Sequence, residues 1–214
     1  MRAVEKSDLT GRARLREAAL ELFAERGFEA TSTRAVAAAA GLSPALVTRH
    51  FGSKEGLRAA VDEYVLGRIA TELSELDPGD AGLMKSLGEV SARLFGSDPV
   101  LRGYLRHVLL EDSAASAALF GRLLSGARKE LDRLSGAHRE NRQDQDRPDE
   151  EWAAFQMLCL ILGPLLLERV MQPHLDEPMF APEVLARRST ANQHLLLHGL
   201  FSRPEGSPEG GAGG

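Results

Sequence analysis

Apolar residues recur with a helical period along almost the whole chain. The first such run has the i, i+3, i+4, i+7, i+8 spacing of one buried helical face. It consists of Leu15, Ala18, Ala19, Leu22 and Phe23. Gly27 follows, as a glycine often does at the C-terminal end of a helix. The sequence has no alternating pattern typical of strands and no internal repeat, so the pattern predicts an all-α fold.

Small and polar residues divide the next stretch into short helices. Thr31, Ser32 and Thr33 are N-cap candidates for a second helix, which runs to residue 40 and ends at Gly41. Ser43 is expected to cap a third helix over about 44–50, and a fourth runs from Ser53 to about residue 74. The second and third helices meet across a three-residue turn, 41–43. This is the layout of a helix-turn-helix unit.

The composition of the third helix suits the major groove of DNA. Leu42, Leu46 and Val47 can anchor it from beneath, while Ala45, Thr48 and Arg49 face outward. Short outward side chains next to an Arg and a His leave room for base edges, and amide groups at helix starts suit phosphates.

Beyond "DPGD" (77–80), the pattern predicts helices near 82–95, 98–111, 113–138, 149–171 and 182–201. The polar run 139–150 is expected to be a mobile loop, and the Pro/Gly-rich end of the chain a disordered tail. Gly163 and Pro164 predict a kink in the fourth of these helices. We therefore expect a DNA-binding domain over 1–60, a helical domain over 61–202, and a tail over 203–214.

Charge is unevenly distributed between the two ends of the chain. Residues 1–60 contain 10 Lys and Arg against 7 Asp and Glu, while the remainder contains 16 against 24. A basic N-terminal part on an acidic body is expected when only that part meets nucleic acid.

The single cysteine, Cys159, lies in the apolar run "QMLCLILGPLLL", which predicts a buried, inert thiol. The N-terminus lacks the apolar core of a signal peptide, and no apolar run is long enough to span a bilayer. These features predict a cytoplasmic protein that does not engage a membrane.

The segment "AALELFAERGFEATSTRAVAAAAGLSPALVTRHFGSKEGL" resembles the DNA-binding domain of the tetracycline-repressor (TetR) family of transcriptional regulators. The matching elements are "LF.E.GF..T", "AAGLS", "HF.SKE.L" and their mutual spacing, over about residues 10–58. The resemblance implies an N-terminal three-helix domain followed by a helical domain that binds an effector and forms a homodimer. A twofold dimer would bind a palindromic operator, with recognition helices about 34 Å apart.

The resemblance also implies roles for individual residues. Thr33 would cap the second helix and touch phosphate, Arg49 would contact a base, and Phe51 would be buried. The full set of expected DNA contacts is Thr33, Arg34, Ser43, Pro44, Ala45, Thr48, Arg49, His50 and Lys54. The family commonly carries Tyr where this chain has Thr48, and Gly is frequent where it has Ala45. The alternatives are a surface ion pair for Arg49, packing against the fourth helix for His50, and a solvated charge for Lys54.

For the C-terminal domain, the resemblance implies an unidentified small effector and a dimer interface. Apolar residues in excess of one core favour an interface over about 149–171 and 182–201. The candidate effector contacts are polar or adaptable residues within apolar helices, each with ordinary core or surface packing as the alternative. They are Met84, Tyr104, His107, Glu111, Trp152, Gln156 and Met157. Effector binding would move the fourth helix and lower operator affinity.

Other classes of protein find little support in the sequence. No nucleophile motif, Cys–His pair or P-loop indicates an enzyme, and no cofactor is expected. His194 and His198 have the i, i+4 spacing of two metal ligands on a helix, but no further ligand lies nearby in the sequence. A helical adaptor that does not bind DNA would require the helix-turn-helix to be degenerate.

Overall fold

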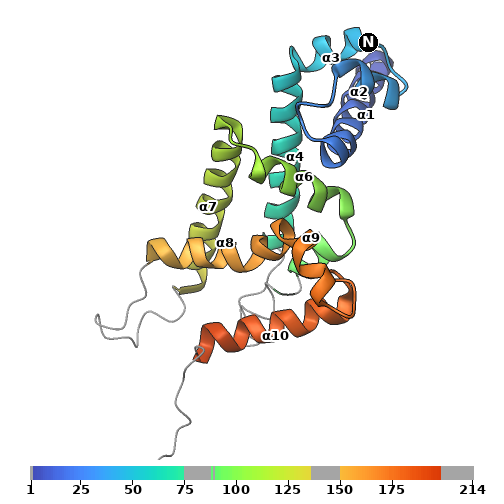
Figure 1. The fold of residues 1–214 in the computed structure, drawn as a ribbon. Helices are drawn as coiled ribbons and strands as arrows, with labels where there is room; N and C mark the ends of the chain where they lie inside the picture. Colours follow the sequence, from blue (N-terminus) through green and yellow to red (C-terminus); the bar gives the residue numbers. More distant parts are fainter. Residues whose placement is uncertain (1, 75–87, 89, 136–149, 199–214) are drawn as a thin grey trace, which may run out of the picture.

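The computed structural model describes residues 2–74, 88, 90–135 and 150–198. Within these ranges every regular element is helical, which confirms the all-α prediction (Figure 1). The helices are α1 (Arg2–Arg26), α2 (Thr33–Ala39), α3 (Pro44–Phe51), α4 (Lys54–Ser74), η1 (Ala92–Gly96), α6 (Pro99–Leu110), α7 (Ala114–Ser135), α8 (Glu150–Leu166), α9 (Glu168–Met171), η4 (Gln172–His174) and α10 (Pro182–His198).

Helices α1, α2 and α3 form a compact head at one end of the molecule (Figure 1). The predicted apolar face of α1 is buried in it, with Leu15 and Ala19 fully covered and Phe23 1% exposed. Val36 and Ala37 of α2 and Val47 of α3 close the core from the other side. The alanines matter here because their short side chains let α2 approach its neighbours closely.

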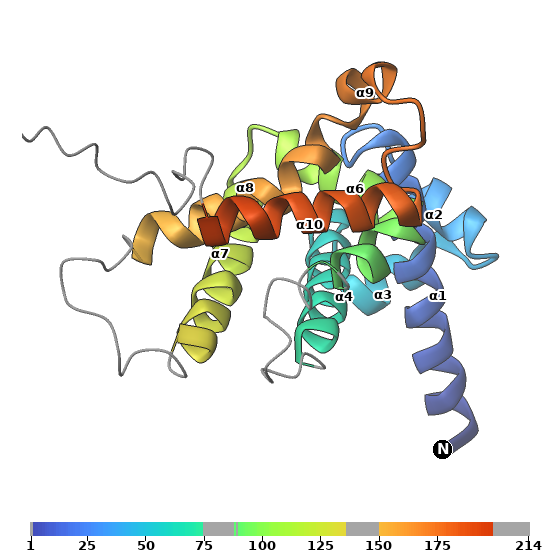
Figure 2. The same cartoon turned by 90° about the horizontal axis from the view of Figure 1, so that it is seen from below.

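Helix α4 runs from this head into the body formed by α6 to α10 (Figure 1). Leu57, Val61 and Val65 are buried along its length and belong to the same apolar cluster as the cores of the head and the body. Figure 2 shows the body from below, with α10 lying across it beside α8. One continuous core therefore joins the two predicted domains.

A second connection between head and body is the packing of α6 on α1. Gly103 makes this close approach possible, because a Cβ added there would lie 2.8 Å from the carbonyl oxygen of Ala24. His107, one turn further along α6, lies against Gly27 at the end of α1. The head is thus held by α6 as well as by α4.

Over the described residues, the predicted helices of the body agree with the structure except in two segments. The helix expected over 149–171 ends at Leu166, and the chain bends by 66° before α9. The kink was expected at Gly163 and Pro164, but Pro164 lies inside α8. The helix is broken instead at Leu167, whose φ of −97° and ψ of 6° leave the helical range. The prediction over 82–95 lies mostly outside the described residues, and its end, Ala92–Gly96, is a π-helix. The predicted loop over 139–150 also lies outside them, except for Glu150, which begins α8, and so does the tail over 203–214.

The expectation of a buried Cys159 is wrong. The thiol is exposed on α8, because the faces of α8 covered by the body carry residues such as Ala154, Leu158 and Leu162 instead. Because apolar residues occur on all sides of this helix, the sequence does not indicate which of its faces is buried. In the described ranges, no single helix is long and apolar enough to cross a membrane; α8 with the α9–η4 segment passes by length and composition only as a bent pair.

Candidate nucleic-acid interface

The turn between α2 and α3 is built around Gly41. This residue has a φ of +64°, which lies in the left-handed region. A residue with a side chain would be strained in that conformation. The amide of Leu42 donates to the carbonyl of Ala37 at 2.8 Å, and the Arg14 guanidinium donates to the carbonyl of Ala40. These bonds satisfy carbonyls at the end of α2 and fix the direction in which α3 leaves.

Helix α3 is anchored from beneath and exposed above, as predicted. Val47 is 1% exposed, and Leu42 and Leu46 pack half-buried against the core. Ala45, Thr48 and Arg49 are exposed. The helix therefore presents a short, sparsely filled face with one long cation, which is the shape that fits between the walls of a major groove.

The helix caps differ in part from the predictions. The N-cap of α2 is Ser32, whose hydroxyl accepts from the amide of Ala35 at 3.1 Å, so the expectation that Thr33 caps the helix is wrong. Ser32 has extended backbone angles, as an N-cap requires, whereas Thr33 is already helical. Ser43 occupies the N-cap position of α3 but makes no side-chain cap bond. Pro44 at the start of α3 is exposed.

The start of α4 is capped as predicted by Ser53, whose hydroxyl oxygen accepts from the amide of Gly56 at 3.1 Å. Hydrogen bonds from its own backbone amide and from Ser53 lower the pKa of Glu55. Thr33 and Arg34 stand at the start of α2, half-buried and exposed respectively. The starts of α2, α3 and α4 thus each carry Ser or Thr beside amide groups that can hold phosphates.

His50, Phe51 and Lys54 lie where α3 meets its neighbours. The Nε2 atom of His50 lies 3.7 Å from a Cβ placed on Gly11, so its half-buried ring packs toward α1. Phe51 is half-buried, with the Arg12 guanidinium 5.1 Å from its ring centre. The Lys54 ammonium lies 4.2 Å over the Phe28 ring and donates to the carbonyl of Glu29 at 3.3 Å.

The charge of this face has one sign. Between Ala30 and Lys54 the chain contains Arg34, Arg49, His50 and Lys54 but no Asp or Glu. Phosphate contacts dominate the affinity of proteins for DNA, and a nearby carboxylate would oppose them. The absence of acidic residues from α2, α3 and the turn between them therefore fits DNA.

The body contains a largely apolar cavity of about 360 Å³ between α4, α7 and α8. Its lining is mostly aliphatic, with polar contributions from Glu63, Ser91 and Arg122. Glu63 accepts from the Arg122 guanidinium at 2.9 Å, and that hydrogen bond lowers the pKa of Glu63. The volume is at the lower end of the range that binds small organic molecules. Of the predicted effector contacts, Met157 lines this cavity.

The structure places Tyr104, His107 and Glu111 on a different face, between α6 and the head. Tyr104 is fully buried and donates its hydroxyl to Asp62 Oδ1 at 2.6 Å. Glu111 pairs with the Arg58 guanidinium at 2.7 Å, and His107 lies against Gly27. Tyr104 and His107 lie one turn apart on α6, and Glu111 directly follows the helix. All three contact α1 or α4 or the residues that join them to the head, and none of them lines the cavity.

The other predicted effector contacts lie elsewhere. Trp152 is 60% exposed at the start of α8, and Gln156 is exposed one turn further on. Met84 lies outside the described residues. His194 is exposed on α10, and the side chain of His198 is not described. Among the side chains that are described, no group of three His, Cys, Asp or Glu could hold a metal ion.

Sequence reasoning missed Arg58 and Asp62, which lie on α4 in its contact with α6 and the head. Arg58 is 6% exposed and its guanidinium lies 4.7 Å over the Phe28 ring. Burial raises the pKa of Asp62, and burial together with the Asp62 charge raises that of Tyr104, which therefore remains a neutral donor. Their spacing of four residues on one face of α4, among buried valines and leucines, was the available signal.

Known proteins resemble the head strongly and the body weakly. Residues 15–61 match the family described as "Bacterial regulatory proteins, tetR family". The HTH-type transcriptional regulatory protein RaaS of Mycobacterium tuberculosis is 51% identical over 79 residues, which cover 35% of this chain and 37% of that protein. The HTH-type transcriptional repressor Rv3405c of the same organism is 42% identical over 64 residues, 30% of this chain and 34% of that protein. The chain thus matches only about a third of the length of these curated relatives.

Similarity in three dimensions extends over the body. A transcriptional regulator from Rhodococcus sp. Rha1 superimposes with a TM-score of 0.67 at 23% identity, over 88% of this chain and 96% of that one. At this identity the likeness establishes the fold alone: a helix-turn-helix head on a helical body.

Proposed function

We propose that the chain is a transcriptional repressor of the TetR family, whose model matches residues 15–61, and that it binds a palindromic operator as a homodimer and is released by a small-molecule effector. The observation that carries this proposal is the face of α3, anchored by Val47, exposed at Thr48 and Arg49, and free of acidic residues from Ala30 to Lys54. Such a regulator works in the cytoplasm, where its operator is.

Each exposed residue of this face has a role that suits its chemistry. Arg49 reads a base, because its planar fork can bond to two acceptors on the edge of guanine. Ala45 and Thr48 leave space beside it, and Thr48 touches a thymine methyl or donates to a phosphate. Pro44, Ser43 and the starts of α2 and α4, with Thr33, Arg34, His50 and Lys54, hold the phosphates on either side.

The dimer is formed by α8 to α10, over the predicted segments 149–171 and 182–201. Large apolar side chains are exposed along this part of the chain, which supports a partner surface there. They are Trp152 (60% exposed), Leu167 (52%), Val170 (63%) and Met171 (38%). A second copy related by a twofold axis would place two α3 helices about one turn of DNA apart, roughly 34 Å.

The effector enters the cavity of about 360 Å³, and α4 carries its effect to the head. One end of α4 contributes Leu66, Ile69 and Leu73 to the cavity, while Leu57 and Val61 near the other end are buried in the core. A ligand that displaces the cavity end of α4 therefore moves the head as well, because the helix is a rigid connection. Arg58 lies on α4 and Glu111 directly follows α6, so whether their ion pair persists depends on how far α4 moves relative to α6.

The proposal is tested by selecting bound duplexes from random DNA with the full chain. The expected result is an inverted repeat with half-site centres about ten base pairs apart. Recovery of sequences without a common motif, or of a motif without twofold symmetry, would contradict the proposal. An enzyme or an adaptor that does not bind DNA would give the first of these two results.

A further inference from the structure

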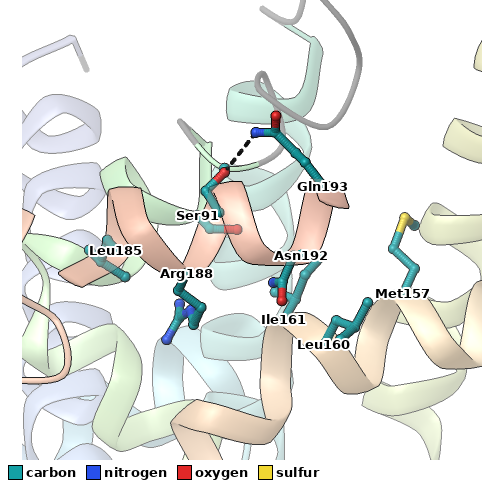
Figure 3. Close-up of a pocket in the computed structure, with 10 residues that line it drawn as sticks. Ser91, Met157, Leu160, Ile161, Leu185, Arg188, Asn192 and Gln193 are labelled. Carbon is teal, nitrogen blue, oxygen red and sulfur yellow. Dashed lines mark hydrogen bonds between the residues drawn. The ribbon is translucent and has the colours of Figure 1, made fainter. Parts of the chain in front are cut away.

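A second, smaller hollow lies beside the apolar cavity, between α8, α10 and the residues Gly88 and Ser91 (Figure 3). Its volume is about 50 Å³, which is enough for a small polar group. Its polar lining comes from Ser91, Arg188, Ser189, Asn192 and Gln193, and the rest of the described lining is mostly aliphatic. The described part of this lining contains a cation, Arg188, and several hydrogen-bonding groups, and none of its residues is a carboxylate.

The inward face of α10 supplies most of these polar groups. Leu185 begins this face and is buried, as a core position should be. The positions that follow on the same face are Arg188, Ser189, Asn192 and Gln193, all half-buried, while Arg187 and Thr190 on the opposite face are exposed. Gln193 donates to Ser189 at 3.2 Å, so these two satisfy each other (Figure 3). A polar face turned toward the body is unusual unless it has a partner.

Arg188 is the unsatisfied member of this face. Its Nη1 atom is buried and has no hydrogen-bond partner among the described residues. Burial lowers the pKa of Arg188, and its nearest aromatic contact places the guanidinium carbon 5.7 Å from the centre of the Phe180 ring. An arginine stays charged in proteins, so the loss of hydration is a cost that a bound anion would remove.

The hollow adjoins the apolar cavity. Ser91, Met157 and Ile161 line both spaces, so the polar hollow and the aliphatic cavity meet at these side chains. Met157 is flexible and unbranched, which lets it move aside without strain. One molecule can therefore reach from the aliphatic lining to the Arg188 guanidinium.

We propose that the effector is an anionic amphiphile, with a hydrocarbon body in the larger cavity and an anionic head group held by Arg188 and Asn192. This inference rests on the proposed function, in which the cavity binds the effector. A carboxylate suits the planar guanidinium fork in two-point contact, and a phosphate offers the same charge with more acceptors. The shared chemistry is a single anionic group at the end of an apolar chain.

The test compares straight-chain carboxylates of 8 to 14 carbons with primary alcohols and alkyl phosphates of equal length, below their micelle concentrations, by isothermal titration calorimetry. The full chain is expected to bind the anions about 10- to 100-fold more tightly than the alcohols. Affinity should rise about fourfold per methylene until the cavity is full. Equal affinity for anion and alcohol, or no binding of any probe, would overturn the proposal.

Arg188→Met keeps the apolar stem and removes the charge, so it should abolish most of the preference for the anion while leaving alcohol binding unchanged. Arg188→Lys keeps a charge without the fork and should retain part of the preference. Arg187→Met is the matched control, since Arg187 is the next residue on α10 and its side chain is 69% exposed. An unaltered anion-to-alcohol ratio in Arg188→Met would overturn the assignment. Dissociation of the dimer by Arg188→Met and Arg188→Lys would also overturn it, by assigning this face to a partner subunit.

Operator affinity, measured separately by fluorescence anisotropy, distinguishes this inference from the proposed function. If the anions bind through Arg188 but do not weaken operator binding, the site stands and the regulatory role fails. If an uncharged ligand releases the operator and the chain binds the anions no more tightly than the alcohols, the proposed repressor function stands and the anion site fails.

Discussion

Arg49 and Arg34 are both exposed cations on the head, yet they should contribute to DNA binding in different ways. Arg49→Ala is expected to cost about 1–3 kcal/mol of operator binding and to relax specificity at one base pair, because a base contact is lost. Arg34→Ala should weaken binding to all sequences equally and reduce the salt slope by about one, because a phosphate contact is lost. Anisotropy titrations over a range of salt concentrations measure both effects. Equal losses on specific and random DNA for Arg49→Ala would refute its role as a base contact.

Asp62 should make the free energy of unfolding fall as pH rises, which is opposite to the effect of a carboxylate whose pKa is lowered in the folded state. Burial raises the pKa of Asp62, so the folded state binds this proton more tightly than the unfolded state. Its contribution to the free energy of unfolding is greatest below the unfolded pKa and falls as pH rises through the folded pKa. In Asp62→Asn, which still accepts from Tyr104, stability relative to the parent should therefore increase from about pH 4 to 7. Urea denaturation at each pH gives the difference.

Glu63 provides the control of sign for that experiment. The hydrogen bond from Arg122 lowers the pKa of Glu63, so its contribution is present above the unfolded pKa and is lost as pH falls. The stability of Glu63→Gln relative to the parent should therefore decrease as pH rises toward 4.5, the ordinary pKa of this carboxyl, and should stay level at higher pH. If both variants shift in the same direction, the environment assigned to Asp62 is wrong.

Residue roles could be predicted from the sequence where a motif fixed them, and not where only a pattern did. The outward placement of Ala45, Thr48 and Arg49 follows from helical period and is confirmed. Tyr104 and Glu111 are polar residues of an apolar stretch, but period alone does not say whether a buried face meets a cavity or another domain. The cap at Ser32 was ambiguous because three hydroxyl residues stand in a row.

At the scale of elements, the turn at Gly41 is sensitive to a single methyl group. A Cβ there would lie 3.1 Å from the Arg14 guanidinium, and the left-handed backbone would be strained in addition. Gly41→Ala should lower the free energy of unfolding by about 1–2 kcal/mol and weaken operator binding further by turning α3. The measurements are urea denaturation and anisotropy at matched temperature.

Gly121→Ala is the matched control, because Gly121 lies in the interior of α7 with nothing within 4 Å of an added Cβ. That variant should gain about 0.5–1 kcal/mol of stability with unchanged operator affinity. A Gly41→Ala protein as stable as the parent would show that the turn does not require the left-handed conformation.

The head was predictable as a set of elements because short helices separated by Gly, Ser and Pro leave strong boundary signals. Gly27, Gly41 and Ser53 all end or begin helices where expected. The body was less predictable, because its apolar residues surround α8 on all sides and leave no clear stripe. The exposure of Cys159 and the break at Leu167 depend on packing with α6 and α7, which local pattern does not encode.

At the scale of the whole molecule, the proposed dimer depends on the exposed face of α8. Cys159 lies near the middle of that face, and Cys159→Glu would place a charge in the interface. Removal of a carboxylate from water without a partner costs several kcal/mol, so the variant should be largely monomeric at micromolar concentration. Size-exclusion chromatography with light scattering reports the mass directly.

Ser125→Glu is the control for this change, since Ser125 is exposed on α7, outside the proposed interface. It should remain dimeric and bind operator normally. A parent chain that is already monomeric would show that the proposed dimer does not form. A Cys159→Glu variant that remains fully dimeric would show that the interface lies elsewhere than on the exposed face of α8.

Sequence-specific DNA binding by the head is the central claim, and a competition titration tests it most directly. The full chain is titrated with a labelled duplex carrying the selected inverted repeat, and with the same duplex scrambled, at one stated salt concentration. We expect an affinity ratio of at least about 10³ in favour of the repeat, most of it lost when one half-site is scrambled. Equal affinity for the repeat and the scrambled duplex would contradict it.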